Sequence, residues 1–191
     1  MKIKRFYAEL LSWCIVTGVG IVTAHLSQAA PVADEYQVKA AFLYHLSNFI
    51  SWPPSAFTSD DQVFKICILG KDPFGVILDV TVENERVVGN RSVNVVRLNK
   101  IAETKICHIL FTNILENASL KELFAITKNY PILTVSDSEN FVVQGGMVEF
   151  FTLDNRIRLM INPDTVEWVG LKAKANLLRL SKIMQVPIPW K

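Results

Sequence analysis

The sequence predicts an α/β fold, a three-layer α/β/α sandwich built on a mostly parallel sheet. Two short runs of β-forming residues, 64–70 (FKICILG) and 105–111 (KICHILF), resemble each other and carry a cysteine at matching places. Helical or turn segments flank both runs, which is typical of neighbouring strands in a parallel sheet. Alternation over 92–98 and the apolar run 131–135 (PILTV) add two more strands.

Helical periodicity accounts for the segments between these strands. Residues 35–50 are helix formers in which Val38, Phe42, His45 and Phe49 recur at helical spacing and share one predicted face. A short helix is expected to about residue 79, with Asp72 as its N-cap, and another over 118–128. Together they would cover the sheet on both sides.

The pattern changes in the last third of the chain. Runs 147–153 and 156–161 flank Asp154-Asn155, which predicts an antiparallel hairpin with a tight turn. Asn162 precedes a proline and a helical pattern, so we expect it to cap a long final helix that ends near Met184. No repeat or linker interrupts residues 30–191, which indicates one domain.

Residues 1–29 have the pattern of a secretory signal peptide. Basic side chains at the start precede a largely apolar stretch, 10–26, and the small residues of Ser27-Gln28-Ala29 form a cleavage site. A membrane anchor is the alternative interpretation. Removing the leader leaves equal numbers of basic and acidic residues, so the sequence gives no indication of nucleic-acid binding.

Two cysteines, Cys67 and Cys107, remain after the predicted cleavage. An even number of cysteines in an exported chain favours a disulfide, although two buried thiols would also fit the strand positions. If the two runs are neighbours in register, the sulfur atoms lie within bonding distance.

The sequence contains no catalytic or metal-binding signature. His45 and His108 are the histidines beyond the leader, and neither has metal-ligand spacing or a nucleophile motif around it. The loop with Gly70, Asp72 and Gly75 (GKDPFG) joins a strand end to a helix start, where α/β proteins bind ligands. Because Asp72 would cap the free amides and repel an anion, we favour a structural cap there.

Large apolar residues near helix ends and the C-terminus form a candidate partner-binding set. Exposed aromatic side chains often anchor protein interfaces, although they can also pack on their own domain. The set comprises Trp52, Trp168, Ile188 and Trp190.

Three stretches together resemble the YfiR family of periplasmic regulators. They are 36–49 with the following Trp52-Pro53, 67–75 (CILGKDPFG), and 132–137 with 145–147 (ILTVSD and GGM). The resemblance extends over nearly the whole chain after the leader, in the same order.

The resemblance implies a non-enzymatic repressor that needs no cofactor. Such a protein binds the periplasmic part of an inner-membrane diguanylate cyclase, keeps cyclic-di-GMP low and limits biofilm formation. An outer-membrane lipoprotein can sequester it, and a homodimer is implied. Cys67 and Cys107 correspond to the family's bridge, but 147–158 lacks the second cysteine pair of some members. The alternative function is a periplasmic sensor that binds a small molecule near Gly70–Gly75.

Overall fold

The structure, a computed structural model, describes residues 32–57, 63–114 and 116–189. The described residues all belong to one unit, Val32–Lys191. The predicted signal peptide, residues 1–29, lies outside them. The helices are α1 (Val32–Phe49), α2 (Val76–Val82), α3 (Asn117–Thr127), α4 (Pro163–Trp168), α5 (Ala175–Leu180) and two 3-10 helices, η1 (Pro54–Ala56) and η2 (Ile101–Ile106). The strands are β1 (Ile50–Ser51), β2 (Val63–Leu69), β3 (Arg86–Val87), β4 (Arg91–Leu98), β5 (Ile109–Thr112), β6 (Leu133–Ser136), β7 (Val148–Leu153), β8 (Arg156–Ile161), β9 (Lys172–Ala173) and β10 (Ser181–Ile183).

A mostly parallel sheet forms the centre, as the sequence predicts. Among the described residues its eight strands follow the order β10-β8-β7-β6-β5-β2-β4-β3. Strands β4, β2, β5, β6 and β7 are parallel to their neighbours in that series. The antiparallel β7–β8 hairpin is also confirmed, and Asp154 and Asn155 take the positive φ angles, 50° and 54°, that its tight turn requires.

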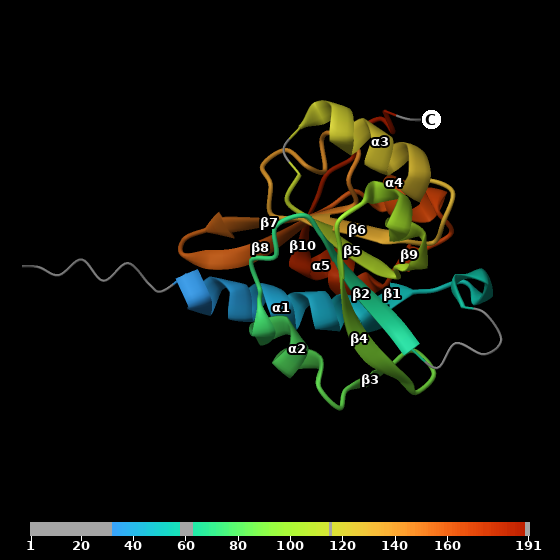
Figure 1. Ribbon diagram of the computed structural model, residues 1–191. Coiled ribbons are helices and arrows are strands. Elements are labelled where there is room, and N and C mark those ends of the chain that lie inside the picture. Colours follow the sequence, from blue (N-terminus) through green and yellow to red (C-terminus); the bar gives the residue numbers. More distant parts are fainter. Residues whose placement is uncertain (1–31, 58–62, 115, 190–191) are drawn as a thin grey trace, which may run out of the picture. The chain divides into compact units, whose positions relative to one another are not determined.

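Side chains of the central strand β2 alternate between two apolar clusters. Phe64, Ile66 and Ile68 belong to the larger cluster, together with residues of α1 and α2. Cys67 and Leu69 belong to the smaller cluster, which includes residues of α3. Helices therefore cover both faces of the sheet, and Figure 1 shows α1 and α2 on the opposite side from α3.

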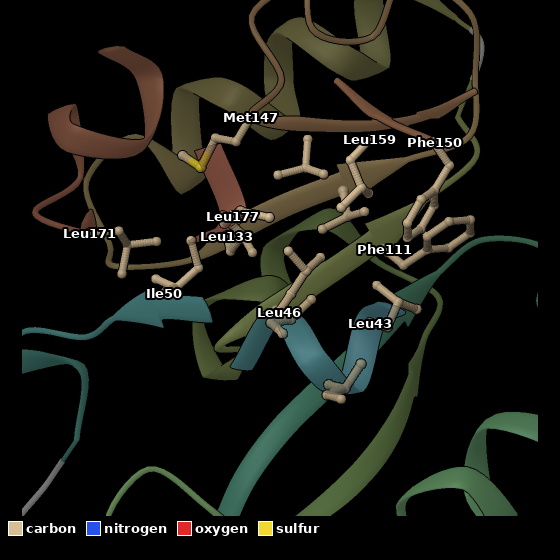
Figure 2. Packing of buried hydrophobic residues seen from close by; sticks show 14 of the residues in the cluster. Leu43, Leu46, Ile50, Phe111, Leu133, Met147, Phe150, Leu159, Leu171 and Leu177 are labelled. Carbon is tan, nitrogen blue, oxygen red and sulfur yellow. The ribbon is translucent and has the colours of Figure 1, made fainter. Parts of the chain in front are cut away.

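The larger cluster extends well beyond the central strands. Figure 2 shows Leu43 and Leu46 of α1 among side chains from the sheet and from the C-terminal segment. The C-terminal contribution comes from Leu171 and Leu177, which are 2 % and 0 % exposed. Burial of each such side chain stabilises the fold by about 1.5–3 kcal/mol, so Leu171 and Leu177 join the C-terminal segment to the core.

Helix α1 differs from its prediction in the face it buries. Its inward residues are Ala40, Leu43 and Leu46, all fully buried, whereas Val38 is 44 % exposed and His45 is also exposed. The predicted face was therefore rotated relative to the real one. The apolar arc is wide enough to fit either face, and contact with the sheet decides between them.

The predicted strand 105–111 begins later than expected. Residues Ile101–Ile106 form η2, and β5 starts only at Ile109. Local polar bonds favour the turn, because Thr104 Oγ1 donates to the Ile101 carbonyl at 2.7 Å and Lys100 N donates to Glu103 Oε2 at 3.3 Å. Consequently Cys67 is opposite Leu110 in the ladder, and the two cysteines do not occupy matching strand positions.

The long final helix to Met184 is absent, and this prediction was wrong. Asn162 does cap α4, since its Oδ1 accepts from Asp164 N at 3.1 Å, but the helix ends at Trp168. Gly170 then takes a left-handed φ of 78°, which turns the chain back. The following residues form β9, which pairs with β1, then α5, and then β10, which pairs with β8.

We predict that Gly146→Ala destabilises the protein, because an added Cβ would overlap the ring of buried Phe141. Overpacking of this kind costs about 1–3 kcal/mol, and thermal unfolding would measure it. Combining the change with Phe141→Leu should recover part of the loss, since the smaller side chain makes room. Additive losses in the double variant would contradict this explanation.

Candidate functional site

The expected disulfide joins Cys67 of β2 to Cys107, which lies between η2 and β5. The S–S distance is 2.02 Å and the Cα atoms are 5.8 Å apart. Both cysteines belong to the smaller apolar cluster, where they pack with Leu69 and Leu110. The bridge therefore fixes the entry of β5 to the middle of the central strand.

His108, the residue after Cys107, faces the opposite side and is held as a structural group. Its Nδ1 accepts from Lys65 N at 3.0 Å, so Nε2 carries the proton and donates to the Ala56 carbonyl at 3.1 Å. The ring stacks on Phe57 and Phe64, with centroid distances of 4.9 and 4.7 Å. A histidine bonded in this way supports the chain around it and has no free nitrogen for proton transfer.

An arginine-centred network fills the loop predicted as an alternative ligand site. Asp72 Oδ1 accepts from Phe74 N at 2.8 Å and from Gly75 N at 3.2 Å. Its Oδ2 pairs with Arg97 Nε at 2.8 Å, and Arg97 also donates to the Gly75 carbonyl at 2.7 Å. The amides and the charge of this loop are thus satisfied from within, which agrees with a structural role for Asp72.

The sequence predicts Asp72 as the N-cap of a helix, but in the structure Asp72 does not occupy that position. Helix α2 begins at Val76, three residues later than predicted, and Gly75 occupies the cap position with a φ of 51°. Asp72 instead closes the turn that precedes the helix. Arg97 continues the network to Asp79 on α2, with its Nη2 2.5 Å from Asp79 Oδ2.

The predicted partner-binding residues fall into different environments. Trp52 is half-buried, donates from Nε1 to the Ser47 carbonyl at 2.9 Å and packs edge-on against Phe64 with centroids 5.1 Å apart. Trp168, at the end of α4, is 45 % exposed. Ile188 is half-buried, and Trp190 lies outside the described residues.

Pairing of β1 with β9 places the segments of the two described tryptophans near each other. Pro53 Cγ lies 3.8 Å from the position that a Cβ atom on Gly170 would take. The turn after Trp52 therefore contacts the turn after Trp168, although about 115 residues separate them. The contact brings two of the four predicted residues to one region of the surface.

Sequence reasoning missed a partly buried charge cluster between α1 and the end of β6. Lys39, only 4 % exposed, contacts Asp137 Oδ2 at 2.7 Å and Glu35 Oε1 at 2.6 Å. Tyr36 donates to the same Asp137 oxygen at 3.0 Å. The one sequence signal for this cluster is the spacing of Tyr36 and Lys39, which lie one helical turn apart. It does not identify Asp137, because that residue is 98 positions beyond Lys39.

Burial and the neighbouring carboxylate act in the same direction on the pKa of Tyr36 but in opposite directions on the pKa of Lys39. Burial and the neighbouring Asp137 both raise the pKa of Tyr36. Burial alone would lower the pKa of Lys39, but its hydrogen bonds to Asp137 and Glu35 outweigh burial and raise it. Both groups therefore keep their protons at neutral pH, and the cluster fastens α1 to the sheet.

Removing both cysteines, as Cys67→Ala with Cys107→Ala, should lower the free energy of unfolding. A closed loop with a sequence separation of 40 residues is worth about 4 kcal/mol in the chain-entropy model. Reducing agent should bring the melting temperature of the wild type close to that of the double variant and leave the variant unchanged. An equal melting temperature for both proteins under oxidising conditions would contradict the prediction.

Asp79→Asn should make stability less sensitive to acid. The hydrogen bonds from Arg97 hold the pKa of Asp79 below its ordinary value of 3.8. A lowered folded-state pKa stabilises the fold fully above that ordinary value, and the contribution is lost as the pH falls below it. Melting temperatures between pH 7 and pH 3 measure the effect.

Glu122→Gln, on the exposed surface of α3, is the matched control for this titration. Glu122 makes no ion pair with the described residues. Its pH profile should follow the wild type. Parallel profiles for Asp79→Asn and the wild type would show that the Arg97 network does not contribute.

Comparison with known proteins supplies the family. No curated protein matches the sequence. Across the described residues, no helix has the length and apolar character to span a bilayer. A family profile described as YfiR/HmsC-like matches residues 36–182, which include most of α1, both cysteines, the loop at Gly70–Gly75 and the β7–β8 hairpin. The match covers well over half of the chain, so the protein belongs to the YfiR/HmsC-like family.

Proposed function

We propose that this protein is a periplasmic repressor of an inner-membrane diguanylate cyclase. It binds the periplasmic domain of the cyclase and holds it inactive, which keeps cyclic-di-GMP low and limits biofilm formation. The observation that carries the proposal is the family match over residues 36–182, because members of this family are regulators rather than enzymes. A second partner, an outer-membrane lipoprotein, would sequester the repressor.

The disulfide supports the proposed location. A bridge between Cys67 and Cys107 persists in an oxidising compartment and is rare in the cytosol. The proposal therefore includes cleavage of a signal peptide, residues 1–29, and a mature domain of residues 30–191. We propose that this single disulfide has a structural role. Residues 147–158 contain no second pair of cysteines that could act as a redox switch.

The proposed partner surface centres on Trp168. Trp168 is 45 % exposed and comes two residues before Gly170, whose turn contacts Pro53. Large aromatic groups at the centre of an interface often dominate binding energy. Ile188 and Trp190 follow on the C-terminal segment and complete the proposed set. Trp52 precedes the turn at Pro53 and is held by its contact with Phe64 and its bond to the Ser47 carbonyl, so it would belong to the edge of this surface.

Repression would work through differential affinity. A repressor that binds one conformation of the cyclase's periplasmic domain more tightly shifts the receptor towards that conformation. Moving a two-state equilibrium from 1:99 to 99:1 requires about 5.5 kcal/mol of preference. A few buried aromatic contacts are sufficient, since single interface residues contribute 2 kcal/mol or more. A homodimer would present this surface twice.

The alternative function is a periplasmic sensor that binds a small molecule. Its proposed location at Gly70, Asp72 and Gly75 receives little support, because Asp72 and Arg97 already bond the groups that would contact a ligand. A thermal shift caused by a metabolite, and abolished by Arg97→Ala, would favour this alternative.

Trp168→Asp should abolish repression without unfolding the protein. Loss of an interface anchor costs at least about 2 kcal/mol, roughly thirtyfold in Kd. The measurement is cyclic-di-GMP in cells that carry the cyclase, together with copurification of the cyclase and the melting temperature of the variant. Cyclic-di-GMP should rise, and the cyclase should no longer copurify.

The matched control is Val76→Asp. Val76 is 75 % exposed on α2, so it introduces the same charge at a different exposed apolar position. This variant should repress like the wild type. Normal repression by Trp168→Asp would disprove the proposed surface. An equal loss of repression in Trp168→Asp and Val76→Asp would show that the partner-binding surface is not localised at α4.

A further inference from the structure

A cavity of about 310 Å³ lies at the amino ends of the central strands. Lys65, near the start of β2, and His108 and Ile132, which directly precede β5 and β6, all contribute to its wall. The loop at Gly70–Gly75 follows the carboxyl end of β2, so the cavity lies at the opposite edge of the sheet. Its volume is at the lower end of the range for sites that bind small molecules.

Among the described residues, the charged side chains that line this cavity are both positive. Lys65 and Lys105 line it, and no carboxylate of the described residues does. Neither lysine forms an ion pair with the described residues, in contrast to Lys39 and Arg97 elsewhere in the fold. Two ammonium groups that no described carboxylate pairs with favour an anionic occupant of the cavity.

The remaining wall offers an apolar and aromatic surface. Ile106 is 48 % exposed there although it is a large aliphatic residue. Tyr130 presents its ring, and Lys105 Nζ lies 5.7 Å from the ring centroid. The ammonium group is therefore already placed beside an aromatic face, so an occupant that meets Lys105 also meets Tyr130.

The floor of the cavity is rigid. His108 is 4 % exposed, and both of its ring nitrogens are bonded to the main chain at Lys65 and Ala56. Cys107 beside it is fixed by the disulfide. The backbone that carries Lys65 and Lys105 is thus held in place before any ligand arrives, which reduces the entropic cost of binding.

We propose that this cavity binds a small organic anion, a carboxylate or a phosphate ester. Lys65 and Lys105 bind the anionic oxygens, and Ile106 and Tyr130 contact the apolar part of the molecule. The site does not depend on the proposed repressor function, because it is argued from the isolated domain. A small metabolite could then bind the protein at the amino ends of the central strands, next to the disulfide.

The test uses the full chain, exported and purified in its oxidised form, with three probes of similar shape. Benzoate and phenyl phosphate carry the anionic group, and benzamide is the uncharged analogue. Isothermal titration calorimetry should show binding of at least one anion, at least tenfold tighter than benzamide. The tighter of benzoate and phenyl phosphate identifies the carboxylate or the phosphate ester as the preferred class.

Lys65→Gln and Lys105→Gln should each weaken binding of the preferred anion at least tenfold. Both positions are at least partly exposed, so the variants should melt like the wild type. Lys121→Gln is the matched control, since Lys121 lines a separate cavity of about 350 Å³ with Leu120 and Phe124. Its affinity for the anion should equal that of the wild type.

Reduction of the disulfide gives a second readout that reports the position of the ligand. Cys107 lines the cavity, so a bound anion should slow reduction by dithiothreitol at least threefold in the wild type and not in Lys65→Gln. Mass spectrometry of trapped thiols measures the rate. Failure of both anions to bind at millimolar concentration, equal binding of benzamide, or equal losses in Lys121→Gln and Lys65→Gln would each overturn the proposal.

Discussion

Burial of β2 on both faces is the constraint on which the rest of the fold depends. Phe64, Ile66 and Ile68 face α1 and α2, while Cys67 and Leu69 face α3, so the strand needs cover on each side. It also pairs along its length with β4 and with β5. A strand in that position can be stable only when both helical layers are complete. The disulfide adds a covalent link at its centre.

The two edges of the sheet are chemically different. The carboxyl end of β2 leads into the network of Arg97 with Asp72 and Asp79, and the end of β6 leads into the cluster of Lys39 and Asp137. The charges of Arg97, Asp72, Asp79, Lys39 and Asp137 at this edge are therefore paired inside the chain. The amino edge instead has Lys65 and Lys105 beside a cavity without a described carboxylate. A molecule that approaches the protein therefore meets two paired charge networks at one edge and two lysines without a described ion-pair partner at the other.

Local sequence signals were enough for most strands and for the hairpin. The alternation in 92–98, the apolar run before Ser136 and the turn at Asp154-Asn155 each determine a short element from nearby residues. The even cysteine count likewise pointed to the bridge, even though the expected register was wrong. The family resemblance came from motifs on α1, at the end of β2 with the loop that follows, and on β6 with the turn before β7.

Elements that depend on distant partners could not be read from the sequence. Residues 163–184 have helical spacing throughout, but Gly170 and the pairing of β9 and β10 with β1 and β8 break the pattern. The same holds for the cluster at Lys39, whose partner is remote in the chain, and for Trp52, which looks surface-exposed until its contact with Phe64 is known. The neighbouring residues in the sequence do not distinguish a tryptophan whose side chain is half-buried from one whose side chain is exposed.

The short ribbon of β1 and β9 also determines when the chain can finish folding. Lys174 N donates to the Phe49 carbonyl at 2.9 Å and Lys174 Nζ to the Asn48 carbonyl at 2.7 Å, so the first helix is capped by residues near the far terminus. Closing the long loop between Phe49 and Lys174 costs conformational entropy, and interactions between residues close in sequence do not offset that cost. The chain must therefore be present as far as Lys174 before α1 acquires these partners, and a segment that stops short of that residue would leave the bonds at Asn48 and Phe49 unmade.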